Sequence, residues 1–277
     1  MLSKKKLDPT LSPDLWSHTR AIAQVPFDPS CIETKIFHIG STSLAIDVIQ
    51  DMDKAHQFLL SRRKFELKNW TDTDIFPHFG VIWPSALALA AELEQFLQDP
   101  TTSPHATRGH NSSDSRSLKC LELGCGLAIP SLLLKKNWSH HDTVVTDRHP
   151  WVPHFLDRNM RKNKVQLEYF PLDWRASGSF ANRFPWIKPH SYDLIYGSDL
   201  LYYPWQPRSL AETIALLVKP EQGRALVADP GRRFMDEFRA QTKSFGLSIL
   251  HESVRSIPWG QTPVNVKIVQ IGSATPE

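Results

Sequence analysis

Cysteine is scarce in this chain: only three occur among 277 residues, and no two form a Cys-x-x-Cys pair. That usage argues against a disulfide framework and a structural zinc site, and it is typical of a reducing compartment. Long apolar runs are also missing, since no segment approaches 18 consecutive apolar residues and no apolar stretch follows residues 1–6. The sequence therefore predicts neither a transmembrane helix nor a secretory signal, and a soluble, cytoplasmic protein is expected.

Concentrated charge of one sign is absent as well. The formal net charge is +3, and the basic residues occur in short runs such as 4–6, 62–64 and 161–164. A dedicated nucleic-acid-binding protein needs a concentrated basic patch, so no nucleic-acid partner is indicated. The 12 histidines lack the partnered spacing of a zinc site, and no metal is expected.

The most informative segment is 118–130, an apolar run that breaks at Glu122-Leu-Gly-Cys-Gly126. Glycine lacks a Cβ, so a turn of this kind lets a ligand approach the backbone closely. Position 129 is Ile, so the Gly-x-Gly-x-x-Gly spacing is not met, and the Gly-Lys-Ser/Thr of a phosphate-binding loop is missing. We interpret the segment as a ligand-binding turn between a strand and a helix, with a plain tight turn as the alternative.

Strand-like and helix-like segments alternate after residue 117, which predicts a doubly wound, mostly parallel, Rossmann-like α/β sheet. No helix is expected between the last two strands, so they should pair as an antiparallel hairpin at the end of a seven-stranded sheet. The expected strands are 118–123, 143–146, 166–170, 192–196, 224–228, 247–252 and 264–271, and the expected helices are 128–137, 151–163, 206–218 and 234–245.

The part of the chain before this pattern is harder to read. A polar stretch rich in Pro and Ser at 98–117 predicts a mobile loop or linker. We divide the chain into an N-terminal extension, residues 1–74, packed on the core, and a main domain, residues 75–277. The elements expected before the loop are helices over 15–24 and 83–97 and short strands over 35–39, 43–48 and 65–70.

Acidic residues recur where the expected strands end. Asp147 lies 21 residues after Gly126, at the position from which a carboxylate accepts hydrogen bonds from ribose hydroxyls in nucleoside-binding folds. Asp173 and Trp174 follow the third strand and could offer a polar group and a flat aromatic surface to a base. The structural alternatives are a helix cap or surface acid for Asp147 and a core residue for Trp174.

A further acid lies after the strand that should neighbour the glycine turn. The segment Ser198-Asp199-Leu-Leu-Tyr202 would then reach the same cleft. A carboxylate there could orient an amine through hydrogen bonds while aromatic walls exclude water, because an in-line displacement depends largely on positioning and desolvation. The structural alternative for Asp199 is a capping acid at a strand-to-helix turn.

Taken in order, Trp83-Pro-Ser, Glu122-Leu-Gly-Cys-Gly, Leu172-Asp-Trp and Asp199-Leu-Leu-Tyr resemble the motifs of methyltransferase family 16. This is a group of class I, seven-strand S-adenosylmethionine (SAM) methyltransferases that contains protein lysine methyltransferases, and the resemblance covers roughly residues 75–272. It implies SAM as the cofactor, no metal, and an acceptor faced by Asp199 and Tyr202. The residues expected at the cofactor are Trp83, Glu122, Gly124, Cys125, Gly126, Asp147, Arg148, Asp173, Trp174 and Ser198.

Two departures from the usual motifs matter. Ala128 stands where a third glycine often occurs, and Leu200-Leu201 replaces the two prolines of Asn/Asp-Pro-Pro-Tyr, which argues against adenine or glutamine amide as acceptor. Asp229-Pro-Gly-Arg232 is similar to the branch acting on the electron-transfer flavoprotein β-subunit, although Arg232 could be only an ion-pair partner. The resemblance predicts methylation of a lysine in a protein substrate. Arginine, histidine or a small amine as acceptor, or a SAM-binding scaffold with little turnover, remain alternatives, and the oligomeric state is left open.

Overall fold

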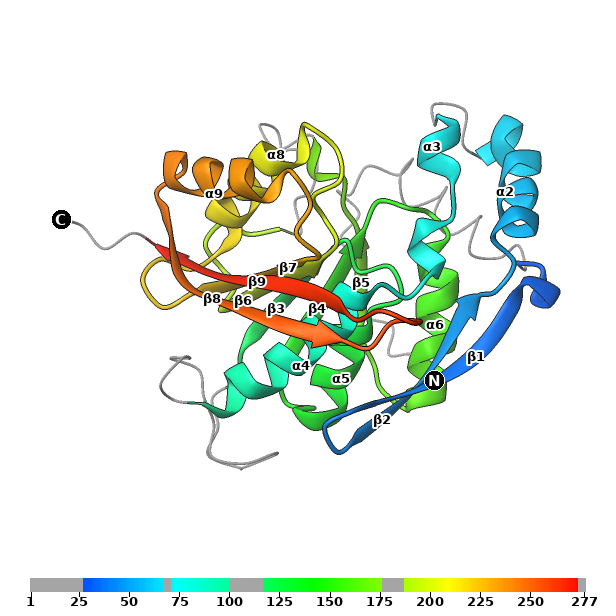
Figure 1. Cartoon of the computed structure of the whole chain (residues 1–277), viewed down its shortest axis with the longest axis horizontal. Coiled ribbons are helices and arrows are strands. Elements are labelled where there is room, and N and C mark those ends of the chain that lie inside the picture. Colours follow the sequence, from blue (N-terminus) through cyan, green and yellow to red (C-terminus); the bar gives the residue numbers. More distant parts are fainter. Residues whose placement is uncertain (1–26, 67–70, 100–116, 176–186, 274–277) are drawn as a thin grey trace.

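The computed structural model describes residues 27–66, 71–99, 117–175 and 187–273, and its centre is a seven-stranded sheet (Figure 1). The strand order is β5-β4-β3-β6-β7-β9-β8; neighbours from β5 to β7 are parallel, whereas β9 pairs antiparallel with both β7 and β8. This confirms the predicted sheet and its terminal hairpin. The strands are β3 (Lys119–Leu123), β4 (Asp142–Asp147), β5 (Glu168–Pro171), β6 (Leu194–Ser198), β7 (Arg224–Asp229), β8 (Leu247–Ile257) and β9 (Val264–Ser273).

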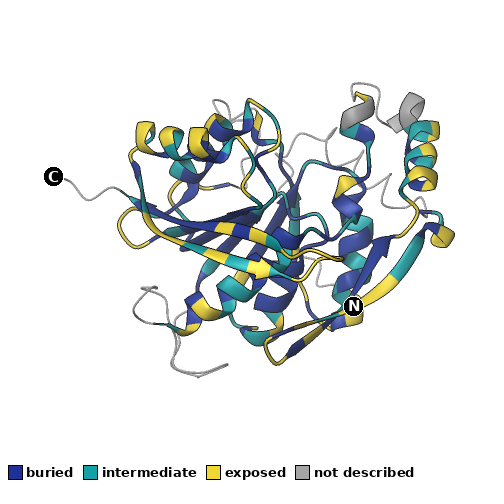
Figure 2. Ribbon diagram, in the orientation of Figure 1, coloured by how far each residue is buried: buried dark blue, intermediate teal, exposed yellow. Residues whose placement is uncertain are grey.

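Helices cover both faces of this sheet (Figure 1). Side chains alternate along each strand, so Leu121 and Ile195 pack on the α8 and α9 side, while Cys120 and Leu194 pack with α4 on the other. Both faces of the parallel part of the sheet are therefore buried, and Figure 2 shows the buried residues concentrated along these strands, whereas the edge strand β8 is mostly exposed or intermediate. The helices are α4 (Pro84–Gln98), α5 (Ile129–Asn137), α6 (Val152–Asn163), α8 (Gln206–Leu217) and α9 (Met235–Ser244).

A separate antiparallel hairpin, β1 (Ile32–Ile39) with β2 (Thr42–Ile49), packs against α6. The backbone N–H of Asp47 donates to the Asn159 side chain at 2.7 Å, and the fully buried Asp47 carboxylate pairs with Arg158 at the same distance. Polar side chains of α6 thus fix β2 in register beside the core. The division of the chain at residue 74 remains a prediction.

One expected element is wrong. Residues 65 and 66 of the strand expected over 65–70 belong to the helix α2 (Met52–Glu66), which is followed by α3 (Asp72–Ile75), and 67–70 lie outside the described ranges. Ala55 and Leu59 are fully buried at the i, i+4 spacing that a helix needs to bury one face. The expected helix over 15–24 and most of the loop over 98–117 also lie outside the described ranges. No helix among the described residues is long and apolar enough to cross a membrane.

Candidate active site

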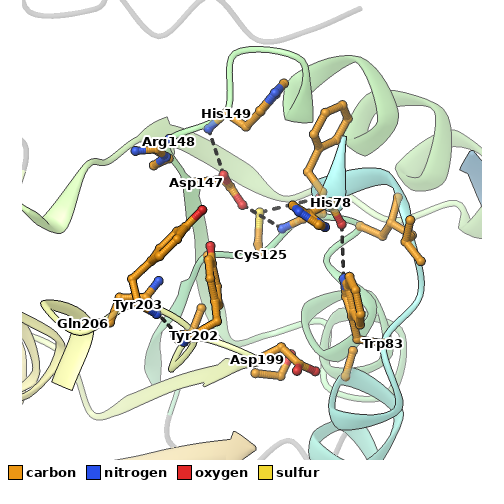
Figure 3. A pocket seen from close by; sticks show the side chains of 18 of the residues that line it. His78, Trp83, Cys125, Asp147, Arg148, His149, Asp199, Tyr202, Tyr203 and Gln206 are labelled. Carbon is orange, nitrogen blue, oxygen red and sulfur yellow. Dashed lines mark hydrogen bonds between the residues drawn. The ribbon is translucent and has the colours of Figure 1, made fainter. Parts of the chain in front are cut away.

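A cavity of about 260 Å³ opens at the carboxyl ends of the central strands. It lies where the strand order reverses between β3 and β6, the place at which open α/β sheets bind ligands. Figure 3 shows Asp147 on one side of it and Asp199 on the other, with Tyr202 between them. The sequence-predicted residues that line the cavity are Trp83, Gly124, Cys125, Gly126, Asp147, Arg148, Asp173, Trp174, Ser198, Asp199 and Tyr202.

The turn between β3 and α5 requires glycine at two positions. Gly124 and Gly126 have φ angles of 59° and 48°, in the left-handed region. A Cβ on Gly126 would lie 3.0 Å from the Phe79 carbonyl oxygen, and one on Gly124 would lie 2.5 Å from the Leu200 side chain. Ala128 also has a positive φ, 56°, and its small, fully buried side chain fits below the turn. Glycine at these two positions therefore allows Phe79 and Leu200 to pack directly against the turn, which lines this wall of the cavity.

Asp147 ends β4 beside this turn and is almost buried. One carboxylate oxygen accepts a hydrogen bond from Gly126 N–H at 2.9 Å, and the other accepts one from His149 N–H at 2.8 Å. Burial raises the pKa of Asp147 above its ordinary value, against the opposing effect of these N–H donors. Each oxygen has a second acceptor site, so the carboxylate can still receive ligand hydroxyls. Asp147 can thus accept the two backbone N–H groups and ligand hydroxyls at the same time.

Glu122 lies below the turn, and it does not line the cavity in the described part of the chain. Its carboxyl group is buried and accepts a 3.3 Å hydrogen bond from the N–H of Ser131 in the first turn of α5. The Ser131 hydroxyl in turn lies 2.7 Å from that of Tyr196. Burial raises the pKa of Glu122 to about 8. The observed role of Glu122 is to support the helix start, and contact with a cofactor stays a prediction.

Charged residues form the rim at the end of β5. Arg148 is ion-paired with Asp74 and lies 4.0 Å from Asp173, which also accepts hydrogen bonds from Arg175 Nε at 2.9 and 3.0 Å. Burial alone would raise the pKa of Asp173, but the Arg175 bonds and charge hold it below its ordinary value. Trp174 is buried beside this rim, with its ring 5.7 Å from that of Trp205.

The opposite side of the cavity is formed by the segment after β6. Asp199 adopts a left-handed φ of 57° and donates its backbone N–H to the Ala228 oxygen at 2.9 Å. Such a conformation is costly for a residue other than glycine, and its occurrence at a cavity wall marks a candidate functional position. The carboxylate is ion-paired with Arg232. Burial raises the pKa of Asp199, and the Arg232 charge opposes this increase.

Tyr202 is half-exposed at the mouth of the cavity. The backbone N–H groups of Tyr202 and Tyr203 both donate to Oε1 of Gln206, each at 2.5 Å. Gln206 begins α8 and is almost fully buried, so its amide fixes the turn that aims both tyrosines. In Figure 3 the two rings point toward the side that carries Asp147 and Arg148.

Several lining residues were not expected from the sequence. The Trp83 indole donates to the His78 carbonyl oxygen at 3.1 Å, and the Phe79 ring lies 4.0 Å from that of His149. The density of aromatic residues over 76–83 is the signal that could have indicated this wall. The additional lining residues are Asp74, Phe76, His78, Phe79, Val81, Ala86, Leu127, Ala128, Ile129, His149, Leu200, Tyr203, Trp205, Gln206 and Arg232.

A parallel sheet with this strand order, a glycine turn after its central strand and an acid at the end of the next strand define a class I methyltransferase fold. The chain belongs to the lysine methyltransferase family, whose model matches residues 62–245, and this confirms the resemblance to methyltransferase family 16.

A curated relative and a solved structure agree with this assignment. Calmodulin-lysine N-methyltransferase of Arabidopsis thaliana is 25% identical over 162 residues, which are 55% of this chain and 51% of that protein. The match thus spans about half the length of the curated relative. The structure of SMU.776 complexed with SAH has a TM-score of 0.53 at 12% identity, covering 86% of this chain and 56% of that one. This similarity supports the fold.

Proposed function

We propose that the protein transfers the methyl group of SAM to the ε-amine of a lysine in a protein substrate. The observation that carries the proposal is that one cavity has the glycine turn and Asp147 on one side and Asp199 on the other, with Tyr202 between them. Membership in the lysine methyltransferase family favours lysine over arginine, histidine or a small amine. The name of the Arabidopsis relative gives calmodulin as that protein's substrate, which makes calmodulin a first candidate to test here.

The residues on the side of the cavity that carries the glycine turn and Asp147 fit a nucleoside cofactor. Gly124 and Gly126 line the cavity and are only partly buried, and Asp147 offers carboxylate oxygens to the two ribose hydroxyls. Trp174 supplies an apolar aromatic surface for adenine, and Asp173 supplies an acceptor near its amino group. When bound, SAM provides a sulfonium-activated methyl group, so this chain needs to supply only binding and orientation.

The residues of the second side suit a lysine amine. An ammonium ion has no lone pair, so the lysine must release a proton before its nitrogen can form the new N–C bond. Asp199 can accept hydrogen bonds from the amine N–H groups and so direct the remaining lone pair along the line of displacement. Tyr202, Tyr203 and Trp205 line the approach and reduce access of water.

The variant Asp199→Asn tests the acceptor assignment, because it keeps the shape and removes the charge. We expect methyl transfer to fall by about a hundredfold or more, while the SAM dissociation constant measured by calorimetry changes little. Asp236→Asn is the matched control, since the Asp236 side chain is 92% exposed on α9. Full activity in Asp199→Asn would contradict the assigned role.

Tritiated SAM with calmodulin or with cell extract tests the acceptor class. A labelled protein band that yields methyl-lysine on acid hydrolysis supports the proposal. Methylarginine, methylhistidine or label in the small-molecule fraction would each identify an alternative acceptor, and tight SAM binding without any label would favour a scaffold. We also propose a cytoplasmic location, which the three free, buried cysteines support.

A further inference from the structure

A single guanidinium group bridges two carboxylates at the acceptor end of the cavity. Arg232 follows β7 and lines the same cavity as Asp199. Its Nη1 atom forms an ion pair with Asp199 and lies 3.1 Å from Oδ2 of Asp229. The Asp229 side chain is fully buried and that of Asp199 is 9% exposed, so both acids are largely removed from water. The charge of Arg232 therefore lies between two desolvated negative charges.

Arg232 is held at its backbone as well as at its guanidinium. Oδ1 of Asp229 accepts hydrogen bonds from Gly231 N–H at 2.8 Å and from Arg232 N–H at 2.6 Å. Oδ2 of the same carboxylate contacts the guanidinium. A long arginine side chain loses conformational entropy when it forms an ion pair. Because Asp229 holds both the backbone and the guanidinium of Arg232, the folded protein has already ordered this side chain. The bridge is thus part of the built cavity wall, with 29% of the Arg232 side chain still exposed.

We propose that Arg232 is a positioning residue that sets the charge state of the acceptor site: it keeps Asp199 ionised and oriented, and it disfavours the protonated form of the incoming amine. The inference rests on the proposed function. An ionised carboxylate accepts hydrogen bonds with both oxygens, whereas a protonated one loses acceptor capacity. A neighbouring positive charge favours the carboxylate and opposes an ammonium ion. The ionised Asp199 supplies acceptors for the amine N–H groups but by itself favours the ammonium form, and the charge of Arg232 offsets that preference.

The groups around Asp199 shift its pKa in opposite directions. Burial raises the pKa of Asp199, and the negative charge of Asp229 raises it further. Arg232 lowers the pKa through its charge and its contact, and from α4 the Ser85 hydroxyl lowers it too. Among the described residues, these are the groups that act on Asp199 from β7 and α4. Without Arg232, burial and the Asp229 charge would raise the Asp199 pKa with only the Ser85 hydroxyl opposing them.

The variant Arg232→Met removes the charge and keeps most of the apolar side chain. We expect the rate of methyl transfer in the presence of saturating SAM to reach its half-maximum about one pH unit or more above the wild-type value. Arg232→Lys should restore most of that shift, because it retains the charge. SAM affinity should change little in either variant. Arg233→Met is the matched control, since Arg233 is exposed and lies over the Phe234 ring outside the cavity lining.

Two further measurements separate this inference from the proposed function. The Asp199 pKa, followed by carboxyl ¹³C NMR and assigned with Asp199→Asn, should rise in Arg232→Met whether or not a substrate is known. Arg232→Gln also removes the charge but keeps a side-chain N–H donor for the two carboxylates, and it should raise the Asp199 pKa as well, which keeps the inference testable if Arg232→Met does not fold. An unchanged Asp199 pKa, or an unshifted pH profile in an active Arg232→Met protein, would overturn the role of Arg232. An inactive wild type with the expected NMR shifts would overturn the proposed function alone.

Discussion

The backbone N–H of Gly126 donates a 2.9 Å hydrogen bond to the carboxylate of Asp147. Gly126 belongs to the turn after β3, and Asp147 is the last residue of β4, the neighbouring parallel strand. The Cys125 N–H also donates to the Thr146 oxygen at 2.9 Å, so the two strand ends are joined twice. Two motifs that are separate in the sequence therefore form one wall of the cavity, and a change in either should alter cofactor binding.

Asp147→Asn should weaken SAM binding without unfolding the protein. Asparagine keeps one acceptor oxygen for a backbone N–H, but it loses the charge that strengthens hydrogen bonds to ribose hydroxyls. We expect the SAM dissociation constant to rise by about tenfold or more, corresponding to the loss of one charge-assisted hydrogen bond. Isothermal calorimetry provides the measurement. Asp142→Asn, at the exposed opposite end of β4, is the control, and equal affinities in the two variants would contradict the ribose role of Asp147.

Two glycine variants distinguish the effect of backbone strain on stability from the effect of a new Cβ on cofactor binding. Gly126→Ala and Gly260→Ala both place a side chain at positive φ, 48° and 59°, and each should lower the free energy of unfolding by about 1–2 kcal/mol. Only at Gly126 does the new Cβ meet an obstacle, the Phe79 oxygen at 3.0 Å; at Gly260 nothing lies within 4 Å. We therefore expect SAM affinity to fall in Gly126→Ala and to stay unchanged in Gly260→Ala. Urea denaturation and calorimetry on both proteins check this.

Local sequence patterns were sufficient to predict the sheet and, to within two residues, the carboxyl ends of its strands, except for β8, which runs to Ile257 and not to residue 252. Strand β3 and its neighbours β4 and β6 are short apolar runs followed by Gly or Asp, and parallel pairing brings their carboxyl ends to one edge of the sheet. That rule depends on topology alone. It is the reason why Asp147, Asp173 and Asp199 were expected at one cavity before any contact was known.

Other features depend on three-dimensional packing that the sequence pattern does not encode. Phe79 reaches the cavity because the segment before α4 packs against the glycine turn. Gln206 accepts the Tyr202 N–H within a tight turn, and the sequence does not reveal the geometry of that turn. Glu122 lies on the face of β3 that α5 covers and accepts the Ser131 N–H, so its position near the strand end does not bring it to the cavity lining. Residues 65–70 have a strand-like composition, whereas the i, i+4 spacing of Ala55 and Leu59 before them indicates the helix α2.

Gln206→Leu should impair methyl transfer while leaving SAM affinity largely intact. Leucine fills the buried space but cannot accept the two N–H bonds from Tyr202 and Tyr203, so the acceptor side of the cavity should lose its fixed turn. We expect kcat/KM for the protein substrate to fall by about tenfold. Gln206→Glu retains an acceptor oxygen and should preserve more activity. A variant Gln206→Leu with wild-type kcat/KM would show that the turn does not need this amide.

Glu122→Gln should make the SAM-free protein more stable than the wild type, and increasingly so as the pH rises. In the folded chain burial raises the Glu122 pKa to about 8, whereas the unfolded chain has the ordinary value of 4.5. Between these values the folded protein retains a proton that the unfolded chain releases, so the free energy of unfolding falls by up to about 1.4 kcal/mol per pH unit. Glutamine does not titrate and still accepts the Ser131 N–H bond. Urea denaturation of both proteins at pH 5, 6, 7 and 8 should therefore give a stability difference that is smallest at pH 5 and largest at pH 8; a difference that is constant with pH would mean that Glu122 is ionised in the folded state.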